Sequence, residues 1–277
     1  MVTIYTGPSD LPRERDKVYK IANAIEYRVG HFTPPKLRVL KAWAEEADAA
    51  EKAVVRIWTA WQAFTHRPDE IKRGFGVKLL ANESKQRLGH FLESAENKRV
   101  WARVQEQALA LGANYILLET PPSFTPAPAN KERLTHFVNH WADLRDGIKL
   151  IWRPSGFWER EESVEITDEL GITLAFDPLI DQKERLPSQD TAYFQMLGRH
   201  GLLDSYSDDD LEFILERCHQ FDTAFVIFRT RDSLTDCLRL QQIKQHFVPM
   251  EDFDYEGEDY EDYEEDDEEY DEDEFEE

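Results

Sequence analysis

The stretch of sequence that decides the fold runs from residue 115 to residue 176 and reads YILLETPPSFTPAPANKERLTHFVNHWADLRDGIKLIWRPSGFWEREESVEITDELGITLAF. It contains three short apolar runs, which are YILLE at 115–119, IKLIW at 148–152 and ITLAF at 172–176. Residues 130–144 and 163–170, between these runs, have helical spacing, and each is followed by a glycine that is a typical helix stop. Continuous apolar runs are typical of strands buried on both faces of a parallel sheet. The stretch therefore predicts repeated β-α units.

The same alternation extends over the rest of the chain in both directions. Five further apolar runs are predicted strands, at residues 2–6, 24–29, 54–61, 193–197 and 224–228. Further helical patterns lie at residues 13–23, 34–47, 98–111, 208–221 and 233–247. Eight strands separated by helices, in about 250 residues, match the count and size of a (β/α)8 TIM-type barrel of the α/β class. A doubly wound open sheet gives a similar alternation, and we favour the barrel because the strand count reaches eight.

The negative charge of the chain is concentrated at its C-terminus. The 277 residues contain 33 Lys and Arg against 57 Asp and Glu, a formal charge of −24. Residues 251–277 hold 20 of these acids and no Lys or Arg, so the rest of the chain is close to neutral. An acidic segment without aliphatic side chains cannot bury a core. We therefore expect a barrel domain at residues 1–248 and a disordered acidic tail at residues 249–277.

The composition also excludes several classes of protein. A hydrophobic content of 41% excludes a wholly disordered chain, and two cysteines, Cys218 and Cys237, are too few for a disulfide scaffold. The N-terminus lacks the pattern of a signal peptide, and no apolar run approaches the roughly 20 residues of a membrane span. The sequence contains no basic stripe with interleaved aromatic residues, so we expect no direct nucleic-acid binding. We expect a soluble, cytoplasmic protein without membrane contact.

Polar residues follow most of the predicted strands, at the barrel end where reacting groups are found in enzymes of this fold. They are Thr6, Glu26, Arg28, His31, His66, Glu119, Arg153, Asp177, Gln195, Arg199, His200 and Arg229. Carboxylates, histidines and guanidinium groups that converge in this way suit a sugar or a phosphate ester. The structural alternative is a set of ion pairs that satisfy one another at the strand ends.

From this set we select five candidate catalytic residues, which are Glu26, His66, Glu119, Arg153 and Asp177. Glu119 or Glu26 would act as base, Arg153 as anion clamp and His66 as acid or ligand. A divalent metal is a possible cofactor, with His66, Glu119, Asp177 and His200 as ligands, although no spacing motif supports it. Four tryptophans on or just past strands are a candidate platform for a sugar or a base, and they are Trp58, Trp61, Trp152 and Trp158.

Several segments resemble, in chain order, the motifs of the domain-of-unknown-function family 72, the DUF72 or YecE-like proteins. The segment 119–124, ETPPSF, is similar to the Gln-x-Pro-Pro-Ser-Phe of that family. Weaker matches are Glu26 in AIEYRVGHF, Phe64-Thr65-His66, Arg153 in IWRPSGFW, and Tyr193 with Gly198. The resemblance covers roughly residues 1–245 and implies a TIM-type barrel. It implies no reaction, because the activity of the family is unknown.

The chain also departs from the family pattern at polar positions. Where the family has Asn, Lys and Glu this sequence has Arg28, Thr59 and Ile151, and Gln195 and Leu197 replace Arg and His. Two hypotheses of function follow. In the first, the mouth of the barrel binds or hydrolyses a sugar or phosphoester, as a hydrolase-like or isomerase-like barrel. In the second, the barrel is catalytically silent and serves as a scaffold whose acidic tail, residues 251–277, engages a basic partner protein.

Overall fold

A computed structural model of the chain describes residues 2–11, 15–71, 85–145, 147–180, 186–198 and 205–249. Almost all of the predicted tail, together with Arg199 and His200, lies outside the described residues. None of the helices in these ranges combines the length and the hydropathy that crossing a bilayer requires.

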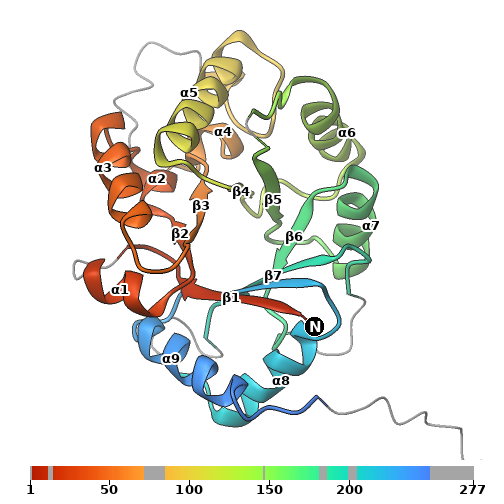
Figure 1. Cartoon of the computed structure of the whole chain (residues 1–277). Coiled ribbons are helices and arrows are strands. Elements are labelled where there is room, and N and C mark those ends of the chain that lie inside the picture. The colour runs from red at the N-terminus through yellow and green to blue at the C-terminus, as the bar shows by residue number, and fades with distance from the viewer. Residues whose placement is uncertain are drawn as a thin grey trace, which may run out of the picture.

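Eight parallel strands form one sheet in the order β1-β8-β7-β6-β5-β4-β3-β2. The strands are β1 (Thr3–Pro8), β2 (Ala24–Tyr27), β3 (Val55–Thr59), β4 (Tyr115–Glu119), β5 (Lys149–Arg153), β6 (Thr173–Phe176), β7 (Thr191–Met196) and β8 (Thr223–Phe228). The first and second strands close the ring through a bridge between Ser9 and Glu26 and a 2.7 Å hydrogen bond from the Asp10 amide to the Glu26 carbonyl. The predicted (β/α)8 barrel is therefore confirmed (Figure 1).

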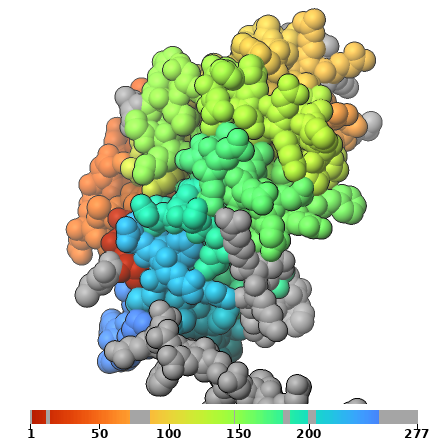
Figure 2. Space-filling view, turned by 90° about the vertical axis from the view of Figure 1, so that its right-hand side faces the viewer, coloured from red at the N-terminus to blue at the C-terminus, as the bar shows by residue number. Residues whose placement is uncertain are grey.

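The helices form an outer layer around the strands (Figure 1). The longer ones are α1 (Arg15–Ile21), α3 (Leu37–Asp48), α5 (Ala95–Leu111), α6 (Pro128–His136), α7 (Arg160–Leu170), α8 (Asp208–Cys218) and α9 (Ser233–Lys244). Short helical turns are α2 (Val29–Phe32), α4 (Gln62–Thr65), η2 (Lys85–Arg87) and η3 (Phe137–Trp141). Figure 2 views the side of the barrel where α6, α7 and α8 lie, and their side chains form the outer surface there.

The helix boundaries follow local signals, and the main differences from the predicted helices are short turns. Ser94 caps α5 by accepting a hydrogen bond from the Asn97 amide, and Gly112 ends the same helix in the left-handed conformation. The turns α2 and α4 were not predicted, because four residues are too few to show helical periodicity. The predicted helix at 130–144 is divided into α6 and the π-helical turn η3.

The barrel has two apolar layers, one between strands and helices and one inside the ring of strands. The inner one consists of Ala24, Ile57, Leu117, Ile151, Ala175, Tyr193, Phe225 and Ile227. Side chains alternate along a strand, so the residue two positions further on also faces the interior. Above this apolar layer the next interior positions on six successive strands are polar, and they are Glu26, Thr59, Glu119, Arg153, Asp177 and Gln195. The fold thus places one ring of polar side chains at the C-terminal mouth.

Candidate functional site

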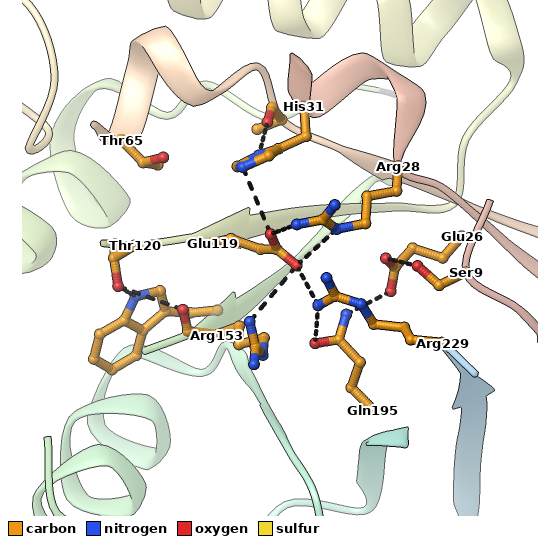
Figure 3. A network of polar contacts seen from close by, with 12 residues as sticks. Ser9, Glu26, Arg28, His31, Thr65, Glu119, Thr120, Arg153, Gln195 and Arg229 are labelled. Carbon is orange, nitrogen blue, oxygen red and sulfur yellow. Dashed lines mark hydrogen bonds and ion pairs between the residues drawn. The ribbon is translucent and has the colours of Figure 1, made fainter. Parts of the chain in front are cut away.

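Glu119, at the end of β4, lies at the centre of a group of basic side chains (Figure 3). Its Oε2 is 2.9 Å from Nη2 of Arg28 and 3.6 Å from Nε2 of His31. Its Oε1 is 3.1 Å from Nη1 of Arg229 and 3.9 Å from Nη1 of Arg153. One buried carboxylate therefore stands among three guanidinium groups and an imidazole.

The protonation of Glu119 follows from these neighbours. Burial raises the pKa of the Glu119 carboxyl, but His31 and the three arginines more than offset it, so this pKa lies well below its usual range. Glu119 is therefore ionised at any physiological pH, and a carboxylate that binds protons so weakly is a poor general base. Its surroundings favour a role as an anchor for guanidinium groups over the role as base predicted from the sequence.

Glu26 is fully buried beside this cluster, and its hydrogen-bond donors are uncharged side chains. It accepts hydrogen bonds from the Tyr193 hydroxyl at 2.6 Å, the Ser9 hydroxyl at 2.6 Å and the Gln195 amide at 2.9 Å. The Gln195 carbonyl oxygen accepts in turn from Nη1 of Arg229 at 3.2 Å, which links the two groups (Figure 3). Burial raises the pKa of Tyr193, so its hydroxyl remains a donor. Glu26 faces the interior of the barrel.

Ser9 is a site residue that sequence reasoning missed. Gly7-Pro8 marks the end of the first strand in the sequence, whereas the structure continues β1 through Pro8. The signal that could have found it is the alternation of the strand, since Ser9 lies four positions after Tyr5, which packs against the inner apolar layer.

His66 follows α4, and its ring lies 5.3 Å from that of His31, centroid to centroid. Its Nδ1 is 2.9 Å from the Thr65 hydroxyl. Burial, and then the proximity of His31, lowers the pKa of His66 to about 3. The His66 imidazole is therefore uncharged at neutral pH, which argues against the predicted role as acid.

A pocket of about 480 Å³ opens beside the cluster, between the C-terminal ends of β5 and β6 and the start of α7. Its lining residues are Arg153, Pro154, Trp158, Glu159, Arg160, Glu161, Ser163, Leu174, Ala175, Phe176, Asp177, Ile180 and Leu197. The structure thus brings two of the five predicted residues, Arg153 and Asp177, to one pocket. Glu119 does not line this pocket, but it contacts Arg153, which does. Glu26 and His66 lie elsewhere at the mouth.

Arg153 has the least satisfied guanidinium of the cluster. Its side chain is 21% exposed, and toward the other described residues it makes no hydrogen bond, only the 3.9 Å ion pair with Glu119. Burial lowers the pKa of Arg153 and Glu119 partly offsets this, but a guanidinium keeps its proton. A second cation lies in the same pocket, because the Arg160 guanidinium stacks 3.8 Å above the ring of Phe176.

Asp177 has the surroundings of a group that can exchange a proton. Its carboxylate accepts the amide hydrogens of Leu179 and Leu197, each at 3.0 Å. Burial raises the pKa of Asp177, although these two amides lower it. An aspartic acid with a raised pKa in a pocket is a candidate for acid–base chemistry.

The predicted metal site and the predicted tryptophan platform receive less support. Within the described ranges no three His, Cys, Asp or Glu side chains are grouped so that they could hold a metal ion, and the proposed ligand His200 lies outside these ranges. Of the four tryptophans, Trp58, Trp61 and Trp152 are buried, so a platform of four is not formed. Trp158 alone of them lines the pocket.

The fold and the mouth define the class of protein, a TIM-type barrel with an arginine-rich C-terminal mouth. No protein-family model matches the sequence, and no curated protein does either. Among solved structures, a DUF72 family protein from Enterococcus faecalis V583 is similar with a TM-score of 0.66 and 12% identity, over 88% of this chain and 98% of that one. A DUF72 family protein from Thermotoga maritima MSB8 is similar with a TM-score of 0.61 and 16% identity, over 88% and 99%. This chain has the fold of the DUF72 family proteins, as the resemblance of the sequence motifs implied.

Proposed function

We propose that the pocket between β5 and β6 binds a small anionic molecule, a phosphoester or a phosphate-bearing sugar, with Arg153 as the group that binds the anion. The observation that carries this proposal is the guanidinium of Arg153, which borders a 480 Å³ pocket without a hydrogen bond to another described residue. A guanidinium carries five N–H donors in a planar fork that matches phosphate and carboxylate oxygens.

The ion pairs that Glu119 makes with three arginines support the role of Arg153 in binding an anion. Arg28 and Arg229 both lie closer to the Glu119 carboxylate than Arg153 does, at 2.9 and 3.1 Å against 3.9 Å. Glu119 is shared among three guanidinium groups and Arg153 lies furthest from it, so the N–H donors of Arg153 remain available to a ligand. The contact with Glu119 also restricts the guanidinium, which reduces the entropy lost on binding.

Asp177 lies in the same pocket and would exchange a proton with the bound ligand. In the hydrolysis of a phosphoester, a water oxygen bonds to phosphorus while the bond from phosphorus to the ester oxygen breaks. Protonated Asp177 would supply the proton that the leaving oxygen takes up, and the attacking water would release a proton to the solvent, from which Asp177 is protonated again. Its raised pKa favours the protonated form more than in an ordinary aspartate.

Arg153→Gln is expected to weaken the binding of inorganic phosphate and of glucose 6-phosphate by about 10- to 100-fold, because a charge-assisted hydrogen bond contributes about 1.5–3 kcal/mol. Isothermal titration calorimetry at constant ionic strength measures this loss. Arg103→Gln, at an exposed position on α5, is the matched control and should bind as the native chain does. Equal affinities of the Arg153→Gln variant and the native chain, or no binding by the native chain, would contradict the proposal.

The second candidate function is capture of a basic protein by residues 251–277, which carry 20 acids and no Lys or Arg. Deleting these residues is expected to abolish the binding of an oligolysine peptide, because the nearly neutral remainder of the chain offers little attraction. Fluorescence anisotropy of the labelled peptide at 150 mM salt measures the change. Undiminished peptide binding by the shortened chain would refute a role for the tail, and its phosphate binding tests the pocket separately.

A further inference from the structure

Two loops beside the pocket carry large apolar side chains that the fold does not bury. Phe157 is 77% exposed and Ile180 is 63% exposed, and they are among the few large hydrophobic side chains of the described residues that face solvent to this extent. Single exposed apolar residues are ordinary on protein surfaces. These two, however, belong to the two loops on either side of one pocket.

Their positions relative to the pocket are set by the chain. Ile180 lines the pocket directly, in the loop after β6. Phe157 does not line the pocket itself, but it lies in the segment between β5 and α7, in which Pro154 and Trp158 do. Trp158 is held in place, because its ring meets that of Trp152 edge to face at 4.8 Å. The loop that carries Phe157 is therefore anchored at the pocket.

The cations line the same pocket that these two loops flank. Arg153 belongs to the polar ring at the mouth, and Arg160 is fixed over Phe176 at the start of α7. Two exposed carboxylates, Glu159 and Glu161, also line the pocket. A ligand with a second anionic group would meet these carboxylates and be repelled, whereas an apolar group would not.

We propose that the ligand of this pocket is a phosphate monoester of an aromatic group, with the phosphate at Arg153 and Arg160 and the aromatic ring against Phe157 and Ile180. This inference rests on the proposed function, because it uses the same anion site. Aromatic rings gain from contact with one another beyond the area that they bury. The aromatic part of the ligand should therefore strengthen binding by about 5- to 20-fold over a hydroxylated part of similar size.

The test compares two monoesters of equal charge, phenyl phosphate and glycerol phosphate, by isothermal titration calorimetry on the full chain. The native chain is expected to bind phenyl phosphate about 5- to 20-fold more tightly. Phe157→Ser and Ile180→Ser should each reduce this preference, and both changes together should abolish it. Val248→Ser, at a position that is 80% exposed but lies after α9 and in neither of these two loops, is the control and should keep the preference.

The outcomes separate the two proposals. Equal affinities for the two esters in the native chain, both weakened by Arg153→Gln, would overturn the aromatic ligand and leave the anion site standing. A preference that survives the double change at Phe157 and Ile180 would also overturn it. If neither ester binds, the proposed function fails together with this inference.

Discussion

Replacing Glu119 with Gln is expected to lower the free energy of unfolding by about 3–5 kcal/mol, because removal of one partner from a buried ion pair leaves the other charges uncompensated. The side chain of Glu119 is only 6% exposed, and it is the shared carboxylate of Arg28, Arg153 and Arg229. An amide of the same shape preserves the packing and removes the charge. The loss should therefore reflect electrostatics and not a cavity.

The effect of Glu119→Gln should depend on pH with a defined sign. The folded-state pKa of Glu119 lies well below that of an unfolded glutamate, so its contribution is complete above the unfolded value of about 4.3 and is lost as the pH falls toward the folded value. The difference in unfolding free energy between the native chain and the variant should be constant from pH 6 to 7. It should shrink below about pH 4.

Urea denaturation at a series of pH values measures both the loss of unfolding free energy in Glu119→Gln and its dependence on pH. The matched control is Glu165→Gln, an exposed glutamate on α7, which should change the unfolding free energy by less than about 0.5 kcal/mol. A loss below about 1 kcal/mol for Glu119→Gln, or one that grows at low pH, would show that Glu119 does not stabilise the guanidinium cluster.

Gly7→Ala should destabilise the barrel by more than about 4 kcal/mol, which is exceptional for a single methyl group. A Cβ at Gly7 would stand 1.6 Å from the carbonyl oxygen of Ala24 and 2.6 Å from its carbonyl carbon. Both are backbone atoms of β2, so no side-chain rotation relieves the overlap. Relief requires β1 and β2 to separate where the ring of strands closes.

Gly171→Ala is the control for this prediction. Gly171 has a φ of +63°, but its added Cβ would meet nothing within 4 Å, so only the backbone preference is lost, about 1–2 kcal/mol. Thermal and urea denaturation compare the two variants. If the Gly7→Ala variant folds, and its free energy of unfolding lies within about 1 kcal/mol of that of Gly171→Ala, then β1 and β2 do not approach each other closely at Gly7 and Ala24.

The succession of strands and helices could be predicted from the sequence because its signals are local. Apolar runs such as 115–119 and 148–152 differ from the flanking helical patterns in their period, and glycines such as Gly112 and Gly171 end helices. The count of eight strands then implied the barrel, and the barrel implied which strand ends face the mouth. The five candidate residues followed from that rule and not from any motif of a reaction.

The roles of these residues could not be predicted in the same way. The pKa of His66, lowered to about 3, and that of Glu119 depend on burial and on charges from distant segments. The spacing of residues along the sequence carries no information on this burial or on these charges. A histidine and a carboxylate that look like an acid and a base in the sequence thus become a neutral imidazole and an ion-pair anchor.

What the sequence by itself determined is the barrel and the polar character of its mouth, because both depend on residue types repeated along short strands. Which of these side chains meet was decided only by the tertiary structure. Arg28 and Arg229 reach Glu119 across sequence separations of 91 and 110 residues, because closure of the sheet brings their strands to one mouth. The guanidinium donors of Arg153 that no described residue accepts depend on how one carboxylate is shared among three arginines, and a sequence does not specify that division.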